Sequence, residues 1–339
     1  EEKLLTIGWT RLAEEWQGVF RHEAKRAMLI VYVDDFKLAA PKGDHDSLWE
    51  SIRSVIDMDP ETLDGRFLGC VHERFTTSAR NVMPMLDNHP SYHPRQKQAC
   101  APAAEAGAAP TVKSVDKIYD PNRKVEVATY NMERFAKDCV SVFCQLSGYS
   151  IDKVGTAPTP FLDDANDPPI MPEEASAAET TRGTNGSSAA EAGTTAGAGE
   201  ATGKLSAIAT KVLMKIMYIA RFARPDLLRA VGALSCMITK WDYLCDRKLL
   251  RIIKYINGSL AWRQIGFIGD SPDELHLGLF SDADFAGDKA TMRSTSGVFL
   301  ALYGPQSFFP LGAQSKKQSA VSHSTVEAEL VAANHAIRT

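Results

Sequence analysis

The chain has 339 residues and a formal net charge of −4, with 38 Lys and Arg against 42 Asp and Glu. This length predicts about two domains, and the slightly acidic balance does not by itself indicate a nucleic-acid-binding protein. No apolar run reaches the roughly 18 residues that a membrane-spanning helix needs. The six cysteines form no C-x-x-C pair and are too sparse for a disulfide framework. We therefore expect a reducing compartment and no membrane partner.

Residues 1–83 alternate strand and helix signals, and two adjacent acids interrupt an apolar stretch. The runs AMLIVYV and FKLAA flank Asp34 and Asp35, which is a hairpin pattern with acids in the turn. Neighbouring carboxylates repel each other, and burying one costs several kcal/mol unless something compensates. The pair therefore lies either in a solvated turn or beside a cation, and the local sequence leaves both interpretations open.

The next segments alternate between ordered and low-complexity patterns. DSLWESIRSVI predicts a helix with a capping box between Ser47 and Glu50, and RFLGCVHERF predicts one strand. Residues 84–125 are rich in Pro and Ala and predict a low-complexity insertion. Residues 126–162 return to an ordered, partly helical pattern. Residues 163–203 predict a disordered acidic linker, because they contain almost no large apolar side chain.

Residues 204–263 contain three helical patterns, with twelve Lys and Arg against three Asp. Pro225 suits the first turn of the second helix, and Asn257-Gly258 suits the end of the third. The basic residues of the third helix are Arg247, Lys248, Arg251 and Lys254. Two interpretations remain open: these bases are solvated helix faces, or they form a surface that faces nucleic acid.

Residues 273–339 predict three strands followed by a helix. Asp282 follows the apolar strand LHLGLF, and Glu329 lies in the first turns of the helix. Carboxylates brought together from a strand and a helix suit Mg²⁺, which prefers oxygen ligands, and pairs of such ions catalyse phosphoryl transfer. A single Asp at a strand end is more often a turn former, so the acids alone do not decide the function.

Several short motifs resemble copia-type LTR retrotransposon Pol polyproteins, in the order found there. LIVYVDDFKLA resembles the Y-x-D-D hairpin of reverse transcriptases, and FLGC, ARPDLLRAVGALS and LLRIIKYINGSL resemble segments that follow it. SDADFAGD, RSTSG, SKKQ and STVEAELVAA resemble the start of the ribonuclease H domain. The resemblance implies an α+β fold: a partial reverse-transcriptase palm, thumb and connection, followed by an incomplete ribonuclease H-like α/β domain.

The resemblance also implies a domain order and a set of site residues. Residues 1–83 would be the partial palm, 126–162 its continuation toward the thumb, 204–263 the basic thumb and connection, and 264–339 the start of the ribonuclease H-like domain. The implied catalytic and metal-binding residues, with Mg²⁺ or Mn²⁺ as cofactor, are Asp34, Asp35, Asp282 and Glu329. The implied nucleic-acid-binding residues are Tyr32, Arg247, Lys248, Arg251, Lys254, Lys316 and Lys317.

The implied partners are an RNA template, an RNA–DNA hybrid, a DNA primer and the rest of the Pol polyprotein. The implied location is intracellular, in cytoplasmic particles or in the nucleus. Each active site lacks carboxylates of the family pattern, upstream of Asp34 and downstream of Glu329. We therefore expect a polyprotein fragment for RNA-directed DNA synthesis and hybrid cleavage that is inactive alone. The alternatives are a non-catalytic nucleic-acid-binding protein that uses the basic helices, and a translated relic without function.

The motif SHSTVEAEL contains two glutamates for which the sequence predicts different roles. Ser324 and Glu327 have capping-box spacing, which would let Glu327 accept from the backbone N–H of Ser324. Glu329 lies about 200° round the helix from Glu327, beside a predicted packed stripe of Leu330 and Ala333. We therefore predict that Glu329, and not Glu327, points toward the first ribonuclease H carboxylate.

Overall fold

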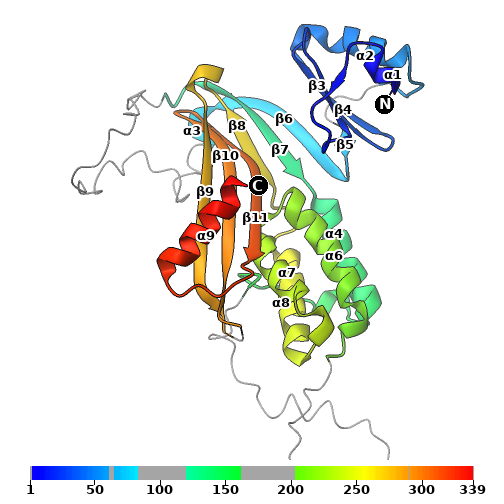
Figure 1. Ribbon diagram of the computed structural model, residues 1–339. Helices are drawn as coiled ribbons and strands as arrows, with labels where there is room; N and C mark the ends of the chain where they lie inside the picture. The colour runs from blue at the N-terminus through cyan, green and yellow to red at the C-terminus, as the bar shows by residue number, and fades with distance from the viewer. Residues whose placement is uncertain (1, 61–64, 83–119, 162–202, 290, 339) are drawn as a thin grey trace, which may run out of the picture. The chain divides into compact units, whose positions relative to one another are not determined.

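A computed structural model describes residues 2–60, 65–82, 120–161, 203–289 and 291–338. They belong to two compact units (Figure 1): unit 1 is Glu1–Met132 with Arg263–Gly269, and unit 2 is Glu133–Trp262 with Asp270–Thr339. The predicted insertion and the predicted acidic linker lie almost entirely outside the described residues. Among the described helices, none has the length and apolar character needed to span a membrane.

Unit 1 contains a small antiparallel sheet that packs against a helix. Phe20, Leu29 and Leu38 are directly opposite one another in three neighbouring strands, so their side chains lie on one face. This face packs against Leu48 and Ile52 of α2 and forms a buried apolar core. The elements are α1 (Glu2–Leu5), β1 (Thr10–Arg11), β2 (Val19–His22), β3 (Ala27–Tyr32), β4 (Asp35–Ala39) and α2 (His45–Arg53).

The α2 helix begins earlier than the sequence predicted. Its N-cap is Asp44, because the short turn Lys42–Asp44 runs directly into the helix. Ser47 therefore lies inside the first turn, where its hydroxyl donates to the Asp44 carbonyl at 3.0 Å. The predicted capping box between Ser47 and Glu50 is wrong.

The other strands of unit 1 form an antiparallel ladder with the order β5-β6-β7-β8. The segment predicted as one strand, RFLGCVHERF, is a hairpin, because Leu68 and Gly69 have left-handed backbone with φ of 52° and 79° and reverse the chain. β8 is distant in sequence from its neighbour β7. The elements are β5 (Arg66–Phe67), β6 (Cys70–Ser78), α3 (Ala79–Val82), β7 (Lys124–Asn131) and β8 (Gln264–Ile268).

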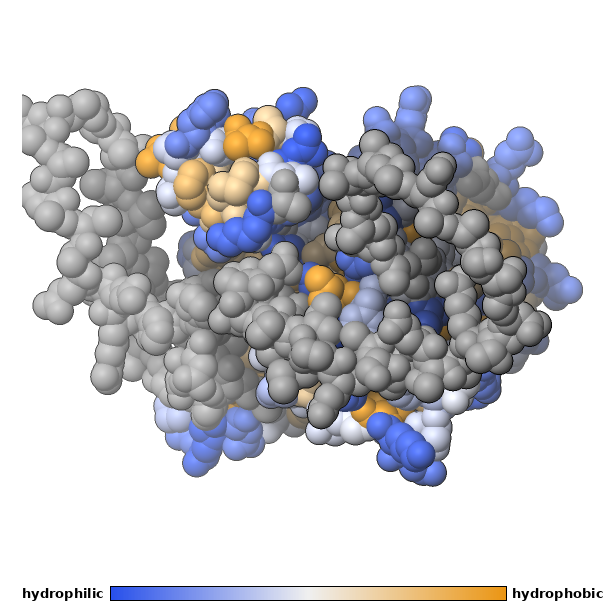
Figure 2. Space-filling model, turned by 90° about the horizontal axis from the view of Figure 1, so that it is seen from below, coloured by the Kyte–Doolittle hydropathy of each residue, from blue (hydrophilic) through white to orange (hydrophobic). Residues whose placement is uncertain are grey.

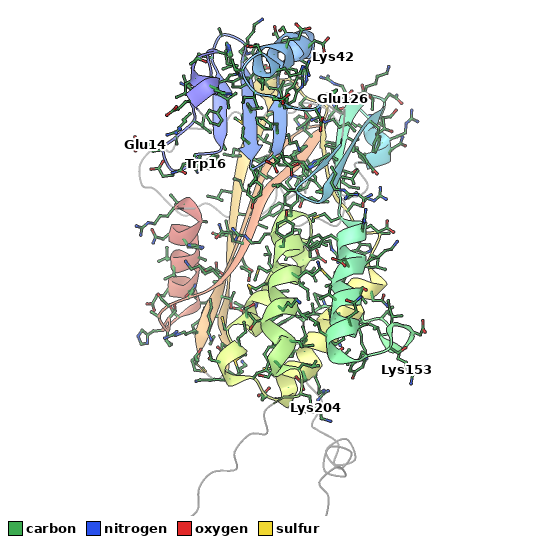
Figure 3. All side chains as sticks on the ribbon, turned by 90° about the vertical axis from the view of Figure 1, so that its right-hand side faces the viewer. Glu14, Trp16, Lys42, Glu126, Lys153 and Lys204 are labelled. Atoms are coloured by element: carbon green, nitrogen blue, oxygen red, sulfur yellow. The ribbon has the colours of Figure 1, made fainter. Side chains whose placement is uncertain are left out.

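Unit 2 is layered: a helix, antiparallel strands in the order β11-β10-β9, and a group of helices (Figures 1 and 3). α9 contacts β9 and β10, whereas α6 and α7 contact β11. Figure 3 shows these helices on opposite sides of the strands. The elements are α4 (Glu133–Ser147), α6 (Ser206–Phe222), α7 (Leu228–Ser235), α8 (Tyr243–Gly258), β9 (His276–Asp288), β10 (Arg293–Gly304), β11 (Ser307–Lys317) and α9 (Thr325–Ile337).

The element order of unit 2 agrees with the sequence pattern. Pro225 opens the short turn that leads into α7, and α8 ends at Gly258, as predicted. The order β9, β10, β11, α9 confirms the predicted three strands and a helix.

On the face visible in Figure 2, hydrophobic residues are interspersed among hydrophilic ones, which is usual for a protein surface.

The charged side chain of Arg224, just after α6, is buried, with 3% of its area exposed. Its Nη2 donates to Asp226 at 2.8 Å, and its Nη1 donates to the carbonyl of Ser259 at 3.0 Å. The rings of Tyr255 and Trp262 lie 5.6 and 5.4 Å from its guanidinium carbon. Burial and a hydrogen bond to Asp226 raise the pKa of Tyr255 to about 12. The network joins the end of α6 to the end of α8.

Replacing Arg224 by Met should lower the free energy of unfolding by about 3 kcal/mol, because buried oxygens of Ser259 lose their donor and Asp226 loses its ion pair. Arg221→Met, at an exposed position of α6, is the matched control and should change stability by less than about 0.5 kcal/mol. Urea unfolding followed by circular dichroism measures both. Unchanged stability of Arg224→Met would contradict a role for this network in fixing α8.

Candidate functional site

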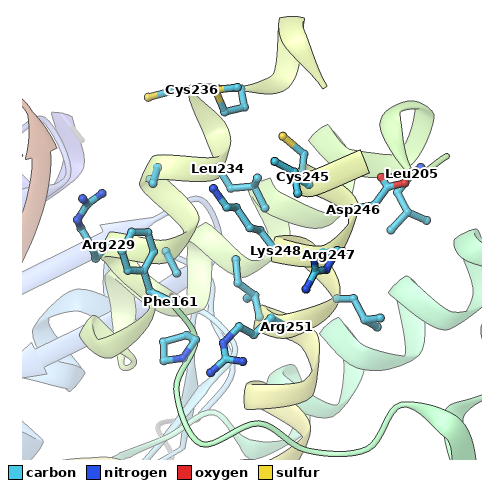
Figure 4. A pocket seen from close by; sticks show the side chains of 18 of the residues that line it. Phe161, Leu205, Arg229, Leu234, Cys236, Cys245, Asp246, Arg247, Lys248 and Arg251 are labelled. Carbon is cyan, nitrogen blue, oxygen red and sulfur yellow. Dashed lines mark hydrogen bonds between the residues drawn. The ribbon is translucent and has the colours of Figure 1, made fainter. Parts of the chain in front are cut away.

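A pocket of unit 2 brings together most of the basic residues singled out in the sequence (Figure 4). Its volume is about 1360 Å³, and residues of α7, α8, β11 and the segment 156–161 line it. We call it the basic pocket. It contains all the predicted nucleic-acid-binding residues except Tyr32, which lies in unit 1. Its Lys and Arg residues are Lys204, Arg229, Arg247, Lys248, Arg251, Lys254, Lys316 and Lys317.

The spacing of bases along α8 explains why they share the pocket. Arg247, Arg251 and Lys254 follow one another at intervals of four and three residues, so they lie on one face of the helix. The opposite face is apolar and buried, with Leu249 and Ile253 both fully enclosed. Burial of the apolar face fixes the rotation of α8 about its axis, and this rotation turns the basic face toward the pocket.

The carboxylate of Asp246 is occupied by hydrogen bonds within the protein. Its carboxylate accepts from the backbone N–H groups of Lys204 and Leu205 at 2.7 and 3.0 Å. It also accepts from the indole N–H of Trp241 at 2.7 Å. The bonds from Lys204 and Leu205 hold the chain where it enters α6 against the first turn of α8. Asp246 therefore contributes to the shape of the pocket.

The other two acids of the pocket are also engaged. Asp242 is the N-cap of α8 and accepts from the backbone N–H of Cys245 at 2.7 Å, and Asp288 pairs with Lys317. The pocket thus sets eight Lys and Arg side chains against three occupied carboxylates. The bases for which no ion pair is found among the described residues are Lys204, Arg247, Arg251, Lys254 and Lys316. The pocket therefore carries a net positive charge.

Residues 155–161 run alongside α8 and border the pocket. The side chain of Asn257 donates to the carbonyl of Gly155 at 3.0 Å. Nearer the pocket, Nη2 of Arg251 donates to the hydroxyl of Thr159 at 2.7 Å. The second bond orients the guanidinium of Arg251, so this base is held in place before any ligand binds.

An aromatic ring lies against another base of the pocket. The ring of Phe161 is 4.6 Å from the guanidinium carbon of Arg229, which pairs with Asp284 at 2.8 Å. Figure 4 shows Phe161 between Arg229 and the basic side chains of α8. Sequence reasoning missed Phe161 because nothing in its neighbourhood is basic. Arg229 could have been found, since it lies in the basic stretch that the sequence analysis described.

The adjacent acids Asp34 and Asp35 lie at the exposed tip of the β3–β4 hairpin. Tyr32 and Asp35 are opposite each other in the ladder, so Val33 and Asp34 form the turn. The predicted hairpin is confirmed, and both carboxylates face water. Within the described part of the chain, no group of three His, Cys, Asp or Glu side chains is arranged to hold a metal ion. The metal-binding role of the pair stays a prediction.

The two acids predicted for a ribonuclease H site lie on different elements, Asp282 on β9 and Glu329 on α9. Ala283 packs against Ala328 and Ala332 of α9 in a buried cluster. Because side chains alternate along a strand, Asp282 is directed away from α9, the helix that carries Glu329. The structure describes no contact between Asp282 and Glu329, and their joint catalytic role stays a prediction.

The α9 helix begins at the predicted N-cap but buries a different stripe. The hydroxyl of Ser324 accepts from the backbone N–H of Glu327 at 3.1 Å, which confirms the cap. The carboxylate of Glu327 accepts from His323 at 2.7 Å, one residue before the predicted partner. Leu330 is 65% exposed, so the predicted packed stripe is wrong. The residues buried against the strands are Ala328, Ala332 and Ala336, whose small side chains allow close approach.

Comparison with known proteins adds the evolutionary relation. The secreted RxLR effector protein 161 of Plasmopara viticola is 34% identical over 121 residues, which are 36% of this chain and 80% of that protein. The retrovirus-related Pol polyproteins from transposons RE1 and RE2 of Arabidopsis thaliana are 34% and 33% identical over 118 residues. No family model and no solved structure matches the chain.

The matches to the two Pol polyproteins indicate that the chain is derived from a retrotransposon. They cover 35% of this chain and 8% of each polyprotein, so the chain corresponds to a small part of either. More particularly, the chain belongs to the family of secreted RxLR effector protein 161 of Plasmopara viticola, most of whose length it matches.

Replacing Asp246 by Ala should lower the free energy of unfolding by about 2 kcal/mol, because three donors, two of them buried, lose their acceptor. The matched control is Asp152→Ala, at an exposed position of the same unit. Urea unfolding midpoints of the two variants provide the comparison. If both variants were as stable as the unaltered chain, Asp246 would not be holding the entry to α6 against α8.

Proposed function

We propose that this retrotransposon-derived protein binds the sugar–phosphate backbone of nucleic acids in the basic pocket and does not itself cut or extend them. The observation that carries the proposal is the convergence of eight Lys and Arg side chains on one pocket. Such a surface binds phosphates and releases their counterions, without reading sequence. The relation to Pol polyproteins makes an RNA template, an RNA–DNA hybrid and a DNA primer the first ligands to test.

The bases of the pocket suit two kinds of phosphate contact. The guanidinium of Arg251 is oriented by Thr159, and a fixed guanidinium can donate two parallel hydrogen bonds to one phosphate. Lys254 and Lys316 are compact charges on flexible stems and can follow a backbone of variable geometry. This combination supports binding to any nucleic acid whose phosphates reach the pocket.

Catalysis of RNA-directed DNA synthesis and hybrid cleavage is a second candidate, favoured by the same relation to Pol polyproteins. It would use Mg²⁺ or Mn²⁺ at Asp34, Asp35, Asp282 and Glu329. These carboxylates do not complete a metal-binding group among the described residues, so we derive no catalytic step from them. Metal-dependent primer extension that Asp34→Asn abolishes would favour this candidate over binding alone.

Binding of a fluorescently labelled RNA–DNA hybrid should weaken steeply as salt rises from about 50 to 200 mM. Replacing Arg247, Lys248, Arg251 and Lys254 together by Gln should flatten the slope of log K against log salt by about 3 to 4, since each phosphate contact contributes about 0.9. Fluorescence anisotropy at several salt concentrations measures the slope.

The control for this experiment replaces four exposed bases of unit 2 that do not line the pocket: Lys153, Lys211, Arg221 and Lys240. This variant loses the same formal charge and should keep most of the slope. Circular dichroism verifies that both variants are folded. A slope that falls equally in both, or in neither, would show that the bases of α8 are only a solvated face.

A further inference from the structure

The basic pocket contains aromatic rings as well as bases. Tyr149, Phe161 and Tyr243 line it together with the Lys and Arg side chains. Tyr149 is 43% exposed, and Phe161 lies against the guanidinium of Arg229. Phosphate binding alone has no use for aromatic rings. A mixture of bases and rings in one pocket indicates a ligand that has both phosphates and flat apolar surfaces.

Unpaired nucleotides have both properties. In a duplex, the bases are already stacked on each other and paired, so a ring in a protein pocket cannot reach their faces. In a single strand, bases can turn outward and stack on aromatic side chains or on Arg guanidinium planes. The Phe161–Arg229 pair provides a ring and a guanidinium in contact, with the phosphate-binding face of α8 beside it (Figure 4).

We propose that the basic pocket binds single-stranded nucleic acid and stacks one unpaired base on Phe161 while Arg247, Arg251 and Lys254 hold the adjacent phosphates. The inference rests on the proposed function and specifies its substrate class. The contacts of the chain just before Phe161 hold this ring in place: Val154 is fully buried, and the hydroxyl of Thr159 accepts a hydrogen bond from Arg251. Phe161 is flanked by Pro160, which limits the backbone freedom lost on binding.

The test uses the full chain and three probes of equal length at one salt concentration: oligo(dT), the same deoxyribose–phosphate backbone without bases, and a DNA duplex. Oligo(dT) should bind about 5- to 150-fold more tightly than the abasic strand, which is the range that one stacked base contributes. It should also bind more tightly than the duplex. Phe161→Leu should remove the preference for bases but leave the salt dependence unchanged.

Two further variants keep the test decisive. Phe161→Tyr retains a ring and should retain the preference, which separates stacking from a folding defect. Phe75→Leu, at a 49% exposed position of β6 in unit 1, should change nothing. Equal binding of oligo(dT) and the abasic strand, tighter binding of the duplex, or an unchanged preference in Phe161→Leu would overturn the stacking inference while leaving backbone binding intact. Failure of all three probes to bind would overturn the proposed function itself.

Discussion

The position of α8 depends on buried polar groups at its two ends. At the C-terminal end, the guanidinium of Arg224 binds Asp226 and both oxygens of Ser259. At the N-terminal end, Asp246 binds the backbone at the entry to α6. Charged groups with little exposure are stable only when they are paired, so each network admits few alternative geometries. Because both ends of α8 are fixed and one of its faces is buried, the basic face of the helix is held toward the pocket.

The charge of the pocket follows from how its acids are used. The chain is slightly acidic overall, and a basic surface must therefore arise from local arrangement. Of the three Asp side chains in the pocket, Asp242 caps α8 and Asp246 binds the backbone at the start of α6. The third, Asp288, pairs with Lys317. The neighbouring bases are consequently not neutralised one by one. The same residues that stabilise the fold of unit 2 thus leave the pocket positive, which is the property that binding to phosphates requires.

The sequence predicted the features that depend on local spacing. The bases of α8 recur at helical intervals, Pro225 and Gly258 mark helix ends, and the acids of the first hairpin lie at its tip. Features that depend on packing were missed or mispredicted. The contact between Phe161 and Arg229 joins residues far apart in sequence, and no local pattern specifies it. For α9, apolar character pointed to Leu330, but the strands accept only alanines at close approach.

The central claim is that nucleic acid occupies the basic pocket, and lysine footprinting tests it most directly. The full chain is acetylated under limiting conditions with and without a saturating single-stranded oligonucleotide at low salt, and mass spectrometry gives the modification of each Lys. The account predicts that Lys248, Lys254 and Lys316 are protected, whereas Lys153 and Lys211, outside the pocket, react equally in both samples. Equal modification of the three pocket lysines with the oligonucleotide bound would contradict it.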